Sequence, residues 1–286
     1  MFSENSTTTR QGGEPPSRGL DIDLKGIRHG FVHGKKVVRA VWDVDIAIPR
    51  SKFICIVGPS GCGKTTLLGM IAGMIIPRGG TVALDGAPIR RGTTDVAYML
   101  ARDALLPWRT AQQNVELGLI VRNIPKEQRY EISSEWLRRM GLSDFADSDV
   151  LRLSQGMRQR VAIARTLALN PRCVLMDEPF AALDAQTRLL IQKEFLSLWE
   201  RERPTVVFVT HDLMEAILLG DRIILMSKRP GKIVADIPID LPRPRDLDSP
   251  FSNDKFGEYY AHLAGRLREE VLAAEEEEES KGANRL

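Results

Sequence analysis

Cysteine is scarce in this 286-residue sequence, and long apolar runs are absent. Cys55, Cys62 and Cys173 follow neither a metal-ligand spacing nor an even-numbered disulfide pattern, which excludes a disulfide scaffold and a cysteine metal site. Two of them lie in apolar, strand-like stretches, so we predict that they are small core residues. Because no run of eighteen apolar residues occurs, we expect no bilayer span. The first residues also lack the apolar region of a signal peptide, so we expect a cytoplasmic or peripheral protein.

A strong excess of one charge is also absent, because 40 basic residues accompany 38 acidic ones. An extended nucleic-acid surface usually shows as a large basic excess, so this balance argues against nucleic acid as a partner. The length suits one large domain or two small ones, and an apolar fraction of 43% is enough to fill a core.

What the sequence does have is one strongly patterned stretch, residues 53–66. The apolar run Phe53–Val57 predicts a buried strand, and apolar residues return at helical spacing after the turn that follows. The turn matches the pattern G-x-x-x-x-G-K-[ST] of a loop that binds phosphate. We therefore predict a nucleotide site whose loop consists of Gly58, Pro59, Ser60, Gly61, Cys62, Gly63, Lys64, Thr65 and Thr66.

The residue types of this phosphate loop suit a triphosphate with Mg²⁺. Backbone N–H groups converge on phosphate oxygens only where no side chain intrudes, and glycine permits this. The helix that follows directs the positive end of its dipole at the phosphates. Lys64 is expected to reach the β- and γ-phosphates, and the Thr65 hydroxyl is expected to ligate Mg²⁺.

Strand-like and helix-like segments alternate around the phosphate loop, which predicts a parallel α/β sheet covered on both faces. We expect a disordered tail at residues 1–20 and a solvated acidic tail at Glu275–Glu279. An antiparallel hairpin is expected ahead of the loop, with its turn at His33-Gly34. The predicted strands are Ile22–Phe31, Lys36–Ile48, Thr81–Leu84, Asp95–Leu100, Cys173–Met176, Thr205–Val209 and Arg222–Met226. The predicted helices are Ala111–Val121, Lys126–Met140, Gly156–Leu169, Ala185–Trp199, Leu213–Leu219 and Lys255–Ala274.

An acidic pair follows the apolar run at residues 173–176. Asp177 and Glu178 stand at the carboxyl end of a strand predicted to be central, so both would face the crevice that holds the phosphate loop. Asp177 would then hold the Mg²⁺ shell, and Glu178 would orient and polarise the attacking water. The alternative is an exposed acidic turn closed by Pro179, which the neighbouring phosphate loop disfavours.

A further segment, Leu153–Arg160, reads Leu-Ser-Gln-Gly-Met-Arg-Gln-Arg. With the loop and the acidic pair, it resembles the nucleotide-binding subunit of an ATP-binding cassette transporter over residues 21–245. The resemblance implies ATP and Mg²⁺ as cofactors and an α/β P-loop NTPase fold. Such a fold has a RecA-like core, an N-terminal antiparallel β layer and an inserted helical subdomain, here at about residues 105–169. Residues 246–286 would form a helical C-terminal extension with an acidic tail.

In that family, this segment meets the nucleotide held by a second subunit. The resemblance therefore implies that the partner's nucleotide is met here by Ser154, Gln155 and Gly156. One phosphate loop and one such segment per chain therefore imply a homodimer with two composite sites. Ser154 is also a natural helix N-cap, which is its purely structural alternative. The sequence departs from the family pattern at Gln155, where glycine is expected, and at Met157, where glutamine is commonest.

The resemblance assigns roles to further residues. Asp184 matches the D-loop and can equally cap the helix that follows it. His211 matches the switch histidine that donates to the γ-phosphate, although a lone histidine is more often a structural residue. Phe31 fits the aromatic ring that stacks on adenine, with an ordinary core role as its alternative. Ala101 stands where the family has a glutamine that touches the Mg²⁺ site, so we expect weaker Mg²⁺ dependence or looser coupling and no loss of ATP binding.

Residues 105–110 and 229–245 resemble the nitrate/sulfonate/taurine importer branch of the family. This implies uptake of a small anionic solute through a separate integral-membrane permease, with an extracytoplasmic solute-binding protein as an indirect partner. The chain would act at the cytoplasmic face of the membrane. Leu105–Trp108 would shape a groove for a short permease helix; the alternative is packing of the helical insert onto the sheet.

Three other functions would use the same phosphate loop. A relative acting on DNA would carry a coiled coil or a zinc insertion between Lys64 and Ser154, where only a compact helical insert without heptads is found. A soluble or assembly-type cassette ATPase would bind a soluble partner instead of a permease. A small-molecule kinase would leave Ser154, Asp184 and His211 unexplained.

Overall fold

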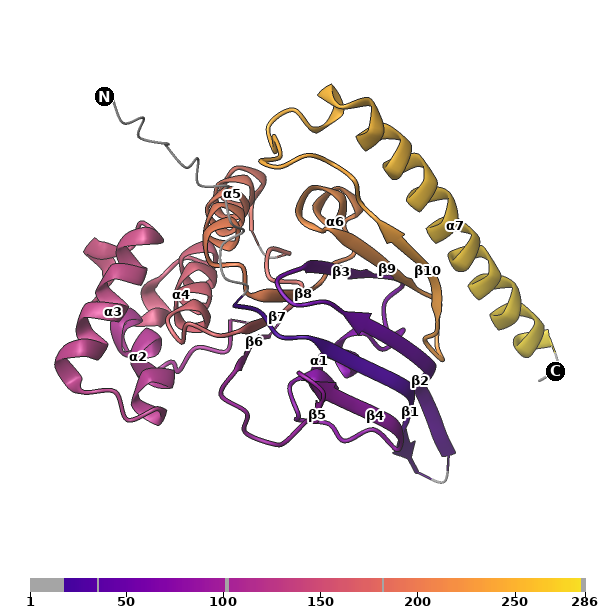
Figure 1. Ribbon diagram of the computed structural model, residues 1–286, viewed down its shortest axis with the longest axis horizontal. Helices are drawn as coiled ribbons and strands as arrows, with labels where there is room; N and C mark the ends of the chain where they lie inside the picture. Colours follow the sequence, from indigo (N-terminus) through magenta and orange to yellow (C-terminus); the bar gives the residue numbers. More distant parts are fainter. Residues whose placement is uncertain (1–17, 35, 101–102, 182, 284–286) are drawn as a thin grey trace, which may run out of the picture.

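The structure is a computed structural model that describes residues 18–34, 36–100, 103–181 and 183–283, with side chains up to residue 270 except that of His33. Its larger sheet has the strand order β10-β9-β3-β8-β7-β6, in which only β10 runs antiparallel to its neighbour (Figure 1). The strands are β3 (Phe53–Val57), β6 (Val96–Met99), β7 (Cys173–Asp177), β8 (Thr205–Val209), β9 (Arg222–Met226) and β10 (Ile233–Pro238). The middle strands β3, β7 and β8 are buried throughout, which is why their sequences are continuous apolar runs.

Successive residues of these strands point to opposite faces, so the sheet has a core on each side. On one face, Phe53 and Phe208 pack with residues of the helices α4, α5 and α6. On the other face, Ile54 and Val207 pack with α1 and the smaller sheet, and Figure 1 shows α1 between the two sheets. These helices are α1 (Lys64–Ile71), α4 (Gln155–Leu167), α5 (Ala185–Glu202) and α6 (Leu213–Leu219).

The smaller sheet is antiparallel, in the order β2-β1-β4-β5. It consists of β1 (Ile22–His33), β2 (Lys36–Ile48), β4 (Gly79–Leu84) and β5 (Ala87–Pro88). The predicted hairpin ahead of the phosphate loop is confirmed. Its first strand continues to His33, two residues beyond the predicted end.

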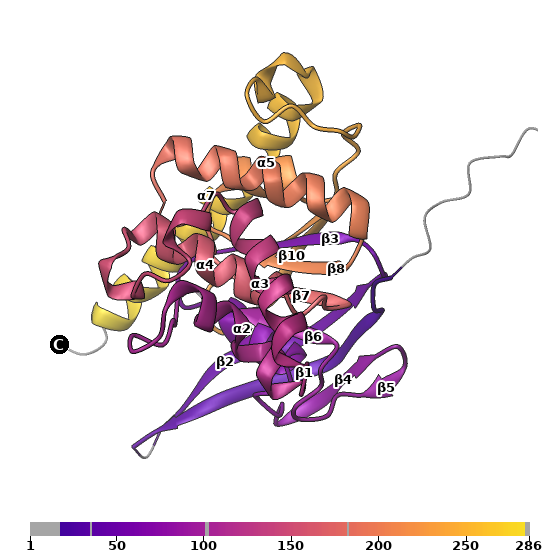
Figure 2. The same cartoon turned by 90° about the vertical axis from the view of Figure 1, so that its left-hand side faces the viewer.

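Between β6 and β7 the chain forms α2 (Ala111–Val121) and α3 (Lys126–Arg139), which pack with α4 on one side of the molecule (Figure 2). Short 3-10 turns occupy Ser143–Phe145, Val150–Arg152 and Pro250–Ser252. The predicted helices here are confirmed to within two residues at each end. The boundaries of a separate subdomain at 105–169 stay a prediction.

Three sequence expectations need correction. The strand β10 was missed, because its half-exposed edge position leaves no continuous apolar run in Ile233–Pro238. The chain is not disordered up to residue 20: Leu20 is buried and Arg18 pairs with Glu202. The last helix, α7 (Asp254–Ala283), continues through the glutamate run that we expected to lie beyond it. Residues 1–17 of the predicted tail lie outside the described residues.

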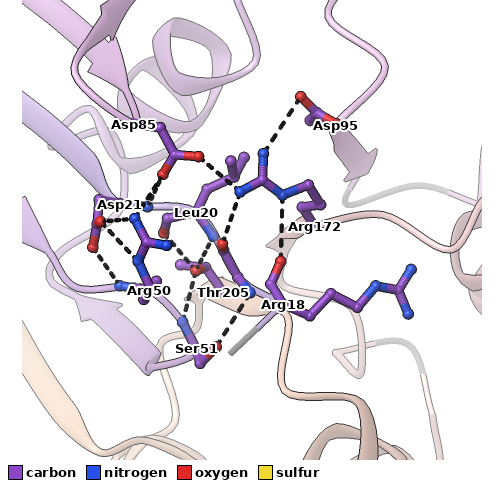
Figure 3. Close-up of polar contacts among 10 residues, drawn as sticks. Arg18, Leu20, Asp21, Arg50, Ser51, Asp85, Asp95, Arg172 and Thr205 are labelled. Carbon is purple, nitrogen blue, oxygen red and sulfur yellow. Dashed lines mark hydrogen bonds and ion pairs between the residues drawn. The ribbon is translucent and has the colours of Figure 1, made fainter. Parts of the chain in front are cut away.

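A polar network joins this N-terminal segment to both sheets (Figure 3). At its centre the fully buried Thr205 hydroxyl accepts hydrogen bonds from the N–H groups of Leu20 (2.9 Å) and Ser51 (3.0 Å) and donates one to the Leu20 carbonyl (2.6 Å). Arg172 donates to Asp85 Oδ2 at 2.7 Å. The network therefore links β8 to Leu20, which precedes β1, and to Ser51, which follows β2.

Replacing Thr205 with Val is expected to lower the free energy of unfolding by about 3 kcal/mol. Valine keeps the shape but leaves the polar backbone groups of Leu20 and Ser51 unpaired in the interior, at roughly 1–3 kcal/mol each. Urea unfolding of the two proteins measures the difference. A loss below about 1 kcal/mol would contradict this account.

The matched comparison is Asp21→Asn at the exposed rim of the same network. The side-chain hydrogen bonds from Arg50 lower the pKa of Asp21 below its ordinary value. Such a carboxylate stabilises the fold above its unfolded pKa, and this contribution disappears as the pH falls through its lower folded pKa. Because both partners are more than a third exposed, the loss at pH 7 should stay within about 1 kcal/mol, and it should begin to shrink only as the pH falls below the unfolded pKa of about 4.

Candidate functional site

A cavity of about 540 Å³ opens over the N-terminal end of α1, a size typical of small-ligand sites. Its wall combines the hairpin β1–β2, the phosphate loop, the end of β7 and the loop after β9. The lining residues are Phe31, Val38, Ala40, Ser60, Gly61, Gly63, Lys64, Thr65, Thr66, Glu178 and Arg229.

The backbone of the phosphate loop requires glycine at two of these positions. Gly61 and Gly63 have φ values of 75° and 108°, a region that residues with side chains rarely adopt. A Cβ atom on Gly63 would also lie 2.5 Å from Val41 Cγ1. Among the described residues no side chain caps α1, so the N–H groups of its first turn can bind an anion.

Lys64 places its charge inside this loop. The side chain is buried, and its Nζ donates hydrogen bonds to the carbonyls of Gly58 (2.7 Å) and Pro59 (3.0 Å). Cys62 does not line the cavity, since its thiol is buried in the core and burial raises its pKa. Gly58 also has a packing role, because a Cβ there would lie 2.7 Å from the Met226 carbonyl oxygen.

The predicted core role of the cysteines is confirmed, since Cys55 and Cys173 are free and buried.

The predicted metal ligands lie together. Asp177 is only 5% exposed, and burial raises the pKa of its carboxyl, while hydrogen bonds from the Thr65 and Tyr98 side chains act in the opposite direction. The described residues contain no cluster of three or more His, Cys, Asp or Glu side chains that could hold a metal ion. One carboxylate and one hydroxyl fit Mg²⁺ that shares its coordination with phosphate oxygens and water.

Tyr98 contacts Asp177 and was not among the site residues that the sequence predicted. It reaches Asp177 because β6 pairs in parallel with β7, with Tyr98 opposite Leu175. Only strand pairing brings these residues together, and no local pattern in the sequence signals it.

Glu178 and His211 also meet, although they end different strands. His211 Nδ1 lies 3.2 Å from Glu178 Oε2. Glu178 has φ +47°, an uncommon value for a residue with a side chain, and its N–H donates to the Val209 carbonyl at 2.9 Å. This backbone directs the carboxylate into the cavity beside Lys64 and Thr65, where a general base would stand.

The outer wall of the cavity consists of Phe31 and Arg229. Phe31 is 48% exposed, and its ring centroid lies 4.9 Å from that of His29 in a T-shaped contact, so the exposed part of the Phe31 ring is available for a base. Arg229, which sequence reasoning did not place in the site, donates from Nε to the Gly61 carbonyl at 3.2 Å. Its only sequence signal was membership of the 229–245 run.

Other predicted site residues lie away from the cavity. Ser154 Oγ accepts from the Met157 N–H at 3.3 Å, and Asp184 Oδ1 accepts from the Thr187 N–H at 3.0 Å. The N-cap alternatives for both are therefore confirmed, while their roles at a partner's nucleotide stay predictions, as do those of Gln155 and Gly156. Ala101 lies outside the described residues.

The site combines a glycine-rich loop around a lysine, a helix N-terminus, oxygen ligands suited to Mg²⁺, and a carboxylate positioned to activate water. On this fold, such a site defines a P-loop nucleoside-triphosphate hydrolase.

Comparison with known proteins defines the family. A family model described as ABC transporter matches residues 41–181. An uncharacterised ABC transporter ATP-binding protein of Methanocaldococcus jannaschii is 46% identical over 88% of this chain and 93% of its own length. The chain belongs to the ABC transporter ATP-binding proteins, and it is an ATP hydrolase that uses ATP and Mg²⁺.

Other relatives are named as import proteins. The nitrate import ATP-binding protein NrtD of Synechocystis is 37% identical over 78% of this chain and 84% of its own. The taurine import ATP-binding protein TauB of Rhizobium johnstonii is 40% identical over 78% and 85%.

A solved structure of a dimeric, post-hydrolysis ATP-binding cassette with ADP and phosphate has a TM-score of 0.71 and 32% identity, covering 77% of this chain and 100% of that one. Cassettes of this family dimerise, work with permeases and are membrane-associated. In the described part of this chain no helix is long and apolar enough to cross a membrane.

Proposed function

We propose that this protein is the ATP-hydrolysing subunit of an importer and energises the uptake of a small anionic solute such as nitrate, a sulfonate or taurine. The similarity to nitrate and taurine import proteins over most of both chains carries the proposal. A separate permease would span the membrane, an extracytoplasmic solute-binding protein would deliver the solute, and this chain would bind at the cytoplasmic face. Residues 21–245 would form the ATPase domain.

The residues of the cavity divide the chemistry among them. The loop N–H groups and Lys64 would bind the phosphates, Phe31 would stack on the base, and Thr65 and Asp177 would hold Mg²⁺. Mg²⁺ would neutralise charge on the phosphate oxygens. Glu178 would accept the proton of the attacking water, and the contact with His211 Nδ1 at 3.2 Å would keep its carboxylate in place.

A second copy of the chain would complete each site. Ser154 and Asp184 are exposed, so both can reach a partner. ATP would bind the closed dimer better than the open one, so binding drives closure. Hydrolysis removes the γ-phosphate that bridges the copies, and the dimer reopens.

The permease would bind beside the loop at residues 103–110. The buried Asn114 holds this loop, because its Oδ1 accepts from the Leu106 N–H at 2.7 Å and its Nδ2 donates to the Leu106 carbonyl at 3.2 Å. Arg158 of α4 pairs with Asp103 at 2.9 Å, so the loop is linked to the helix that begins at residue 155. Trp108 in this loop is 74% exposed, so its side chain can pack against an apolar helix of the permease.

Detergent extraction with a tagged chain tests this function. We expect a membrane permease to co-purify, and we expect Trp108→Ala to abolish this association while the purified subunit keeps its ATPase activity. Tyr130→Ala, a similarly exposed aromatic on α3, is the matched control and should retain the permease. Recovery of a soluble partner alone would favour an assembly-type ATPase instead.

A further inference from the structure

A second, smaller cavity lies behind the Glu178–His211 pair. It has a volume of about 40 Å³, and its polar lining comes from Glu178, Arg188, Thr210, His211, Asp212 and Glu215. A water molecule needs about 10–15 Å³ and two to four polar partners, so one ordered water fits here.

Arg188, in the first turn of α5, connects two loops across this cavity. Its Nη2 donates to the Leu183 carbonyl at 3.1 Å, and its Nη1 lies 3.9 Å from Asp212 Oδ2. Leu183 directly precedes Asp184, and Asp212 directly follows His211. The Arg188 Nε is buried, and no described residue accepts a hydrogen bond from it, so a water in the cavity would satisfy this donor.

The other side of the cavity is held by side-chain hydrogen bonds. Glu215 is buried, and its two carboxylate oxygens accept hydrogen bonds from Thr210 Oγ1 (2.6 Å) and from Gln192 Nε2 of α5 (2.8 Å). The Asp212 N–H donates in turn to Thr210 Oγ1 at 3.0 Å. The backbone on both sides of His211 is therefore held against α5, the helix that begins at the Asp184 cap.

We propose that Arg188 is a positioning residue that couples the loop at Asp184 to the Glu178–His211 pair. Contact of Asp184 with a second copy orients the Leu183–Asp184 peptide, Arg188 passes this orientation to Asp212, and His211 then holds Glu178. The proposal rests on the proposed dimer. The planar guanidinium is needed because one nitrogen donates to Leu183 while another lies within ion-pair distance of Asp212 and the buried Nε still has a proton to donate, a combination that a lysine ammonium cannot match.

Steady-state kinetics of the purified full chain test this coupling. Arg188→Met should lower kcat for ATP by about tenfold and reduce the Hill coefficient for ATP towards one, with KM unchanged within about twofold. Arg188→Lys should restore less than half of the lost rate. Asp184→Asn keeps the helix cap and serves in a double-mutant cycle with Arg188→Met. Once one of the two substitutions is present, adding the other should lower kcat almost no further.

Arg201→Met, in the last turn of the same helix, is the control and should leave kcat, KM and the thermal midpoint unchanged. The proposal is overturned if Arg188→Met keeps the wild-type kcat, if its KM and thermal midpoint deteriorate together with kcat, or if the Arg188 and Asp184 effects multiply independently. Since no permease is present in this assay, failure of the import function would leave its outcome unchanged and would be seen only in the co-purification.

Discussion

Glu178→Gln is expected to lower kcat for ATP hydrolysis by at least about 10²-fold, the lower end of what a lost general base costs. Glutamine fills the same space between the cavity and His211, but its amide cannot take a proton from water. Nucleotide binding should survive, because the contacts of the phosphate loop and Lys64 are untouched. The variant should therefore accumulate with ATP as a closed dimer.

Single-turnover kinetics measure the rate, and size-exclusion chromatography with ATP and Mg²⁺ measures the dimer. Glu131→Gln makes the same chemical change at an exposed position of α3 and should behave as the wild type in both assays. Turnover of the Glu178 variant near the wild-type rate would assign the base to another group. A variant that stays monomeric with ATP would argue against the composite site.

Gly231→Ala is expected to lower the free energy of unfolding by about 3 kcal/mol and to weaken ATP binding. A Cβ at this buried position would lie 1.9 Å from the Cys62 carbonyl oxygen and 2.7 Å from Met226 Cε. The backbone at Gly231 cannot shift away from Cys62 without losing two hydrogen bonds. The Gly231 N–H donates to the Ala40 carbonyl at 2.9 Å, and the Gly231 carbonyl accepts from the Trp42 N–H at 3.0 Å. The methyl group must therefore displace the middle of the phosphate loop.

Gly257→Ala is the matched control, because a Cβ on that glycine of α7 meets no other atom within 4 Å. Alanine is the better helix former by about 0.5–1 kcal/mol, so this variant should be as stable as the wild type or slightly more stable. Urea unfolding and ATP titration compare the two variants. Equal stability and equal affinity for ATP in both would show that the loop tolerates the displacement.

Local patterns explain why much of the fold could be predicted. Continuous apolar runs located β3, β7 and β8, and glycine with lysine at fixed spacing located the phosphate loop before α1. These signals lie within a few residues of the chain. The half-exposed edge strand β10 lacks such a signal, and the anchoring of Leu20 depends on a hydroxyl 185 positions away.

The sequence by itself determined that this chain binds a nucleotide. The spacing of Gly58, Gly63 and Lys64 places backbone N–H donors around the lysine charge, and this arrangement depends only on residues within the loop. The sequence also determined that acidic and histidine side chains end buried strands. Only the tertiary structure decided which of these side chains meet. Parallel pairing of β7 with its neighbours set Tyr98 against Asp177 and Glu178 against His211, since contacts between strands depend on register, which no single segment encodes.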